Sequence, residues 1–115
     1  MAIVEDEPKL SVIYERVLKR DGFSDLLIAS SGDEIVKLAG NSSLKIDIVI
    51  IDYRMPGKLN GLEAAKELVR LNSNTSVIIA TSDANAESEA KSLGFDFIRK
   101  PFSIIRLIEL VNSKT

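Results

Sequence analysis

Short runs of β-branched and other apolar residues alternate along the chain with longer segments in which apolar residues recur every three or four positions. The short runs predict strands, and the longer segments predict amphipathic helices. The strongest strand signal lies in Ile46–Ile51, where Ile48 to Ile51 are all β-branched, as expected of a strand covered on both faces of a parallel sheet. The predicted strands are Ala2–Val4, Phe23–Ala29, Ile46–Ile51, Ser76–Ala80 and Phe95–Ile98.

A predicted helix follows each predicted strand. The first helix lies between Pro8 and Asp21-Gly22, which are typical start and stop signals, and its apolar residues are Leu10, Ile13, Val17 and Leu18. The others are Gly32–Ala39 with Ser31 as its cap, Leu62–Leu71, Ala84–Leu93 and Ser103–Asn112. Their predicted inward residues are Ile35, Leu38, Ala39, Leu62, Ala65, Val69, Ala86, Ala90 and Leu93. Five such units predict one α/β domain over residues 1–115, with a parallel sheet covered by helices on both faces.

The last predicted helix has a wider apolar surface than a core-facing stripe needs. Its apolar residues are Ile104, Leu107, Ile108 and Val111, broadened by Ile105 and Leu110 to about 220° at ~100° per residue. The excess is explained either by contact with neighbouring elements or by a partner surface. We favour the partner surface, and with it a homodimer through the last helix.

Composition narrows the chemistry. The 115 residues contain neither Cys nor His, which excludes disulfides, thiolate or imidazole metal sites and catalysis by histidine. Any metal must be bound by oxygen, which favours Mg²⁺, Ca²⁺ or Mn²⁺, and any covalent nucleophile must be Asp, Glu, Ser, Thr, Lys or Tyr. A net charge of −2, the lack of a long apolar run and the lack of a signal pattern lead us to expect a cytoplasmic protein without direct nucleic-acid or membrane binding.

Charged and hydroxyl side chains follow four of the five predicted strands. They are Glu5, Asp6 and Glu7, then Asp52, then Thr81 and Ser82, and finally Lys100. Ligands of open parallel sheets bind at the carboxyl ends of the strands. Converging carboxylates persist there if a cation lies between them or if one stays protonated. Mg²⁺ suits such a site, and Lys100 with Thr81 would then hold the oxygens of a phosphoryl group, as phosphoryl transfer requires.

Each of these residues also has an ordinary interpretation. The acidic run suits a solvated turn before a helix, Asp52 and Thr81 suit helix or turn caps, and Lys100 suits the surface. Phe97 suits the core. Because these residues belong to four separate strand ends of one sheet edge, a shared functional role explains them better than four unrelated ones.

Four segments carry a resemblance over nearly the whole chain. They are Ile3–Pro8 (IVEDEP), Asp52–Gly57 (DYRMPG) with Asn60-Gly61 beyond, Ala80–Ser82 (ATS) and Phe97–Phe102 (FIRKPF). In this order and spacing they resemble the receiver domain of two-component response regulators. The resemblance implies a flavodoxin-like (βα)5 three-layer sandwich with strand order 2-1-3-4-5. It further implies a signalling switch rather than a conventional enzyme. Such a switch takes a phosphoryl group from a sensor histidine kinase in a Mg²⁺-dependent reaction and controls a downstream effector.

The resemblance also implies roles for individual residues. Asp52 resembles the phospho-acceptor, and Glu5, Asp6, Asp52 and the backbone carbonyl of Arg54 resemble the Mg²⁺ ligands. Thr81 and Phe97 resemble the hydroxyl and the aromatic ring of the conformational switch. Lys100 resembles the lysine that pairs with phosphoryl oxygens, and Lys100-Pro101 resembles a cis peptide bond of the family.

The chain departs from the family pattern in three places. The first strand is short, which leads us to expect a trimmed chain. The loop Pro56–Gly61 has one residue more than the commonest pattern, which would alter the rim of the site. Phe97 replaces the commoner Tyr, so a switch that uses a phenolic hydrogen bond is excluded.

Two rival functions are a binding-only pseudo-receiver and a phosphatase with an aspartyl nucleophile. The complete set Asp6, Asp52, Thr81 and Lys100 argues against the first. Haloacid-dehalogenase-like phosphatases have a second Asp two residues after the nucleophile, where this chain has Arg54, which exchanges no proton near neutral pH. Arg54 and Asp83 are instead expected to meet as an ion pair beside the acceptor.

Overall fold

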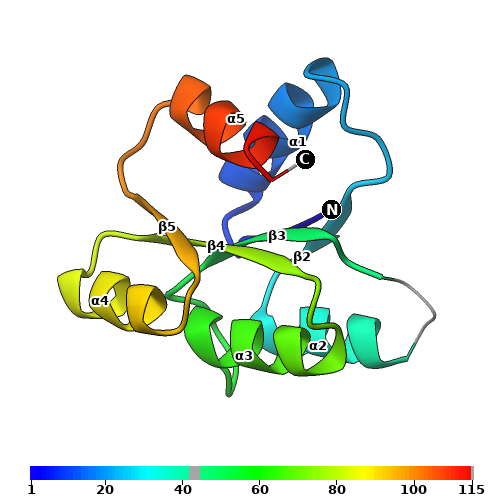
Figure 1. The fold of residues 1–115 in the computed structure, drawn as a ribbon. Helices are drawn as coiled ribbons and strands as arrows, with labels where there is room; N and C mark the ends of the chain where they lie inside the picture. Colours follow the sequence, from blue (N-terminus) through cyan, green and yellow to red (C-terminus); the bar gives the residue numbers. More distant parts are fainter. Residues whose placement is uncertain (42–44, 115) are drawn as a thin grey trace.

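The computed structural model of the chain describes residues 1–41 and 45–114. Within these residues five parallel strands form one sheet in the order β2-β1-β3-β4-β5 (Figure 1), which confirms the predicted order. The strands are β1 (Ala2–Val4), β2 (Leu27–Ala29), β3 (Ile48–Asp52), β4 (Ser76–Thr81) and β5 (Asp96–Arg99).

The helices lie on both faces of the sheet and complete the predicted three-layer sandwich. They are α1 (Pro8–Arg20), α2 (Gly32–Gly40), α3 (Gly61–Leu71), α4 (Ala84–Ser92) and α5 (Ile104–Asn112). Helices α1 and α5 cover one face, and α2, α3 and α4 lie on the other (Figure 1). Among the described residues, no helix combines the length and apolar character that crossing a bilayer requires.

The strands bury alternate residues in two separate cores. In β3, Val49 and Ile51 pack on the α2–α3–α4 side, whereas Ile48 and Ile50 pack on the α1–α5 side. Because successive side chains of a strand point to opposite faces, a run of four β-branched residues fills both cores at once. The central strands are thereby fixed in register, since a slip by one residue would exchange the two sets.

Hydrogen-bonded caps fix where α2, α3 and α5 begin. Ser31 accepts a hydrogen bond from the Glu34 amide, which confirms it as the α2 cap. Asn60 and Glu63 form a reciprocal capping box at α3, and Ser103 accepts from the Arg106 amide at α5. Each cap satisfies an amide that would otherwise lack a partner within the helix.

Two predicted strands are too long at their N-terminal ends. Strand β2 begins at Leu27 rather than Phe23, because Asp25 has a positive φ of 56° that breaks the extended chain. Strand β3 begins at Ile48 rather than Ile46, and the carbonyl of Ile46 accepts a hydrogen bond from the Thr75 hydroxyl.

Two residues predicted to face inward, Leu38 and Leu93, are exposed, and so is Ile13, one of the periodic apolar residues of the first helix. In α1 the buried residues are Ser11, Tyr14 and Leu18, of which the sequence pattern had included only Leu18. Leu93 lies at the C-cap of α4, beyond the last helical turn that packs on the sheet.

The last helix is only partly as predicted. Leu107, Leu110 and Val111 are buried in the α1–α5 core, so the position of Leu110 is explained by internal packing. Ile105 is 70% exposed, and the side chain of Ile104 lies outside the described part of the structure. The surplus apolar surface of α5 is therefore narrower than the sequence pattern indicates.

Replacing Ile79 with Ala is expected to lower the free energy of unfolding by about 2–5 kcal/mol, because the side chain is fully buried in the central strand β4. Val12→Ala is the matched control, because Val12 is 45% exposed on α1 and its replacement should change stability by no more than about 0.5 kcal/mol. Urea unfolding of both variants measures the difference. Equal losses would contradict the assignment of Ile79 to the core.

Candidate functional site

The register of the sheet brings the predicted residues to one edge. Val4 pairs with Ile51, so Glu5 and Asp52 leave neighbouring strands side by side. Thr81 pairs with Arg99 at the end of β4 and β5, and the amide of the next residue, Lys100, donates to the Thr81 carbonyl at 2.9 Å. Sheet pairing therefore places Glu5, Asp52, Thr81 and Lys100 together although up to 95 residues separate them.

Three carboxylates form the acidic part of this edge. Glu5, Asp6 and Asp52 each offer one oxygen, and the three oxygens lie within 4.8 Å of one another. Glu5 is buried, Asp6 is exposed, and the side chain of Asp52 is 12% exposed. An open, all-oxygen set of this kind fits a hard divalent cation such as Mg²⁺, which uses few protein ligands and retains waters.

Lys100 bridges two of these carboxylates. Its Nζ donates to Asp52 Oδ2 at 2.9 Å and lies 3.6 Å from Glu5 Oε1. Burial of the ammonium acts to lower its pKa, but the hydrogen bond and charge of Asp52, with the charge of Glu5, outweigh burial and raise the pKa. Lys100 is therefore a half-buried member of the site rather than an ordinary surface lysine, and its bond to Pro101 is cis as predicted.

The same environment strongly raises the pKa of the Glu5 carboxyl. Burial raises the pKa of its carboxyl first, the Asp52 charge raises it further, and the result is about 7. The amide of Glu7 donates to Glu5 Oε2 at 3.3 Å, and this bond, with the charge of Lys100, offsets only part of the shift. At neutral pH the metal-free site can thus relieve its charge repulsion by holding a proton on Glu5.

A hollow of about 200 Å³ lies over Asp52. Its lining residues are Asp52, Arg54, Thr81, Ser82 and Lys100. Thr81 is buried, and its Oγ1 accepts a hydrogen bond from the Asp83 amide at 2.9 Å. Thr81 is not the cap of α4, because Asp83 occupies that position and accepts from the Asn85 amide. The Thr81 hydroxyl proton remains available to a ligand in the hollow.

Arg54 and Asp83 meet beside this hollow, as predicted. Arg54 Nη2 lies 3.4 Å from Asp83 Oδ2, and the Arg54 side chain is 79% exposed. An exposed pair of this kind contributes little to stability. Its position is more informative, because it joins the loop after Asp52 to the segment after Thr81.

Comparison with known proteins identifies the family. The response regulator receiver domain family matches this chain over residues 1–112. The chain belongs to that family. The four sequence segments that carry the resemblance all fall inside the matched range.

Relatives of this receiver domain include proteins of two sizes. The chain is 33% identical to an uncharacterized transcriptional regulatory protein, YcbL, of Bacillus subtilis, covering 96% of this chain and 48% of that protein. It is 30% identical to the chemotaxis protein CheY of Thermotoga maritima, covering 96% and 92% respectively. The chain thus spans about half the length of the first relative and nearly all of the second.

Solved structures agree with the fold. The response regulator protein TrrA of Thermotoga maritima, in complex with Mg²⁺ and BeF, superposes with a TM-score of 0.85 at 27% identity, covering 99% of this chain and 96% of that one. A Francisella response regulator receiver domain gives a TM-score of 0.84 at 30% identity, with 98% and 93% covered.

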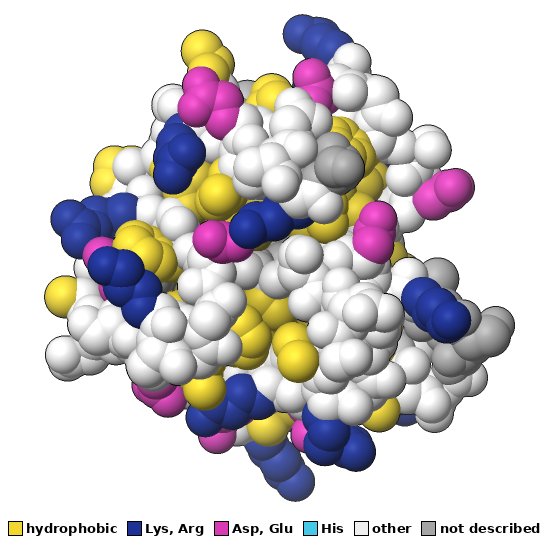
Figure 2. Space-filling model, viewed as in Figure 1, with side chains coloured by type: hydrophobic (Ala, Val, Ile, Leu, Met, Phe, Trp, Pro, Cys, Tyr) yellow, Lys and Arg dark blue, Asp and Glu magenta, His cyan; other side chains and the backbone are white. Residues whose placement is uncertain are grey.

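Phe97 lies apart from the hollow of this receiver domain. It is half-buried on β5, packs on the core under α4, and its ring centroid is 5.7 Å from the Lys91 ammonium. Arg99, two residues on, pairs with Glu87 of α4 at 2.7 Å. Figure 2 shows basic and acidic side chains gathered over this α4–β5 side of the molecule. Phe97 therefore packs beneath α4 and does not line the hollow over Asp52.

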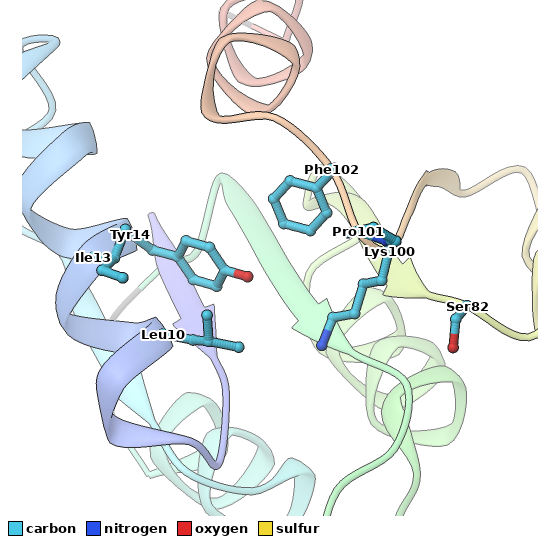
Figure 3. A pocket seen from close by; sticks show the side chains of 7 residues that line it. All are labelled: Leu10, Ile13, Tyr14, Ser82, Lys100, Pro101 and Phe102. Carbon is cyan, nitrogen blue, oxygen red and sulfur yellow. The ribbon is translucent and has the colours of Figure 1, made fainter.

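The sequence pattern did not predict an apolar pocket that shares Ser82 and Lys100 with the hollow over Asp52. It encloses about 620 Å³ and is lined by Leu10, Ile13, Tyr14, Ser82, Lys100, Pro101 and Phe102. Tyr14 of α1 stacks on Phe102 with ring centroids 5.9 Å apart, and Figure 3 shows the Lys100 side chain extending along the opposite side. The spacing Leu10–Tyr14–Leu18 is the signal that would have placed Tyr14 on the inner face.

Glu5→Gln is expected to remove a pH dependence from the metal-free receiver domain. Glu5 ionises near pH 4.5 when unfolded but near 7 when folded, so ionisation destabilises the wild type as pH rises through this window. The free energy of unfolding of the wild type should fall, relative to Glu5→Gln, by up to about 3 kcal/mol between pH 4.5 and 8.

Urea unfolding in EDTA at several pH values measures this difference. The difference between the two proteins removes the contributions of titrating groups that do not interact with Glu5. Parallel profiles for wild type and variant would show that Glu5 has an ordinary carboxyl.

Proposed function

We propose that residues 1–115 act as a phospho-accepting receiver domain, which takes a phosphoryl group on Asp52 and changes conformation to control a partner. The observation that carries the proposal is the Lys100 ammonium, held 2.9 Å from Asp52 in the hollow that Thr81 lines. An anionic group attached to Asp52 would meet a cation, a hydroxyl donor and open space there. These are the positioning and charge stabilisation that phosphoryl transfer needs.

Glu5, Asp6 and Asp52, with the backbone carbonyl of Arg54, are the proposed Mg²⁺ ligands. The all-oxygen donor set and its closely spaced carboxylates support this assignment. Bound Mg²⁺ would neutralise charge on the phosphoryl oxygens and on the acceptor. The Mg²⁺–BeF complex of TrrA, a structural neighbour, is consistent with the same chemistry in this chain.

The chain's own residues would act as follows. A carboxylate oxygen of Asp52 attacks the phosphorus while the bond to the donor breaks on the opposite side. Lys100 turns from the carboxylates to a phosphoryl oxygen, and the Thr81 hydroxyl donates to another. Because Thr81 Oγ1 also accepts from the Asp83 amide, movement of Thr81 pulls on the start of α4. That helix buries only Ala86 and Ala90, so little apolar contact resists its displacement.

Phe97 is the proposed second part of the switch. It packs under α4, and a shift of that helix changes the space available to its ring. The proposed donor is a sensor histidine kinase and the proposed recipient is an effector that recognises the altered α4–β5 side. We further propose a homodimer through α5, in which Ile105 is the exposed apolar residue. The proposed location is cytoplasmic, without direct contact to nucleic acid.

Asp52→Asn is expected to abolish labelling by acetyl phosphate. Wild type should gain one phosphoryl group in Mg²⁺ and none in EDTA, because the carboxylate and the cation are both required. Intact mass measures the gain. Asp25→Asn is the matched control, since Asp25 is exposed, lies outside the hollow and has a positive φ that Asn tolerates.

The same experiment separates the rival functions. A wild type that never gains mass and consumes no acetyl phosphate would support a binding-only pseudo-receiver. Rapid consumption without accumulation would support a phosphatase. Stoichiometric labelling of Asp52→Asn would overturn the choice of acceptor.

Arg54→Ala is expected to shorten the lifetime of the phosphoryl group. Arg54 reaches across to Asp83 at the mouth of the hollow, where water must approach the phosphorus. If this pair must open first, its ~0.2–1 kcal/mol corresponds to a factor of about 1.5 to 5 in rate. Dephosphorylation after removal of the donor, at one Mg²⁺ concentration, measures the effect.

Arg70→Ala is the matched control for this rate. Arg70 is an exposed arginine that pairs with Glu67 on α3, so the substitution removes the same charge and leaves the lining of the hollow unchanged. An Arg54→Ala rate equal to or slower than wild type would show that Arg54 does not shield the phosphoryl group.

A further inference from the structure

The loop between β3 and α3 begins at the acceptor and returns to it. The Gly61 amide donates to the Tyr53 carbonyl at 2.9 Å, which closes the loop beside Asp52. A Cβ at Gly61 would lie 2.4 Å from the Asp52 carbonyl oxygen, so only glycine permits this close return. The loop carries Arg54, whose carbonyl is a proposed metal ligand, and it holds the extra residue noted in the sequence.

A side chain from a different part of the chain holds the far side of this loop. Asp33 lies in the first turn of α2, and its Oδ1 accepts a hydrogen bond from the Leu59 amide at 3.0 Å. Its Oδ2 accepts from the Lys58 amide at 3.2 Å. Both carboxylate oxygens are therefore used on backbone amides that have no strand or helix partner.

The loop backbone is shaped to receive this carboxylate. Gly57 has a φ of +100°, and a Cβ at that position would lie 3.0 Å from Asp33 Oδ1. Any other residue at Gly57 would be strained and would also press on the carboxylate. The hydrogen bonds from Leu59 and Lys58 hold the pKa of Asp33 below its usual value, so the carboxylate stays ionised at neutral pH.

We propose that Asp33 is a positioning residue for the metal site, because it ties the β3–α3 loop to α2 and thereby fixes the carbonyl of Arg54. The inference rests on the proposed Mg²⁺ site and extends it to a residue that ligates nothing. With residues 53 and 61 joined at one end and 58 and 59 held by Asp33, the segment from Arg54 to Gly57 is bracketed between two fixed points. Without Asp33 only the first of these ties remains.

Titration of backbone amide NMR shifts with MgCl₂ tests this role in the intact chain. Asp33→Ala should weaken Mg²⁺ binding about 10-fold, the lower end of the effect of removing an outer-shell partner. In EDTA the Lys58 and Leu59 amides of the variant should exchange with solvent faster than in wild type. Asp33→Asn keeps one acceptor oxygen without the charge and should recover part of the affinity.

Glu34→Ala is the matched control. It removes the same charge from the next position of α2, and its side chain accepts from the Ser30 amide rather than from the loop. If charge alone mattered, Glu34→Ala would weaken binding as much as Asp33→Ala, and this result would overturn the proposal. Urea unfolding checks that each variant remains folded.

The remaining outcomes separate this inference from the proposed function. If wild type and Asp33→Ala bind Mg²⁺ with equal affinity, only the proposed role of Asp33 is overturned. A wild type that binds no Mg²⁺ would overturn the metal site and this role together.

Discussion

Repulsion among three carboxylates at the carboxyl edge of the sheet is the constraint that the rest of the site has to satisfy. Two unit charges about 5 Å apart repel by roughly 3 kcal/mol at an effective dielectric constant of 20. Glu5, Asp6 and Asp52 lie within that range, and Glu5 is withdrawn from water. Lys100 compensates only part of this charge, and burial of Glu5 together with the charge of Asp52 raises the pKa of Glu5, so this edge favours uptake of a proton or a cation.

The sheet maintains this unfavourable arrangement because apolar packing elsewhere fixes it. Each of the central strands β1, β3 and β4 buries alternate residues in two cores, so no strand can slide to separate the carboxylates. Their ends then carry the charged groups to one edge regardless of the electrostatic cost. A binding site that is preorganised in this way offers its charge to a ligand without first having to collect it.

Much of this architecture could be predicted from the sequence, for identifiable reasons. The β-branched run at Ile48–Ile51 and the regular alternation of strands and helices specify a parallel sheet, and parallel sheets gather strand ends. The positions of Glu5, Asp52, Thr81 and Lys100 follow from that rule. Residues at the margin of a stripe, such as Leu38, were misplaced because helical periodicity does not say how wide the covered face is.

Contacts between loops could not be predicted in the same way. The bonds from Lys58 and Leu59 to Asp33 join residues 25 and 26 positions apart, and neither their spacing nor their composition marks them. Tyr14 on Phe102 is a similar case, because the β5–α5 connection has no period from which its path could be inferred. What periodic patterns leave open here is the geometry of segments that follow the strands.

These loop contacts divide the surroundings of Asp52 into parts that are held with different strength. The Asp33 carboxylate accepts hydrogen bonds from two amides of the β3–α3 loop and the Gly61 amide donates to the Tyr53 carbonyl, whereas Arg54 reaches Asp83 through an exposed ion pair of small energy. The proposed ligand carbonyl is thus fixed by the chain, while the side chain of the same residue can leave the mouth of the hollow at little cost. Arg54 would then have two roles: its backbone carbonyl would keep the metal geometry constant, and its side chain would move to open the entrance of the hollow.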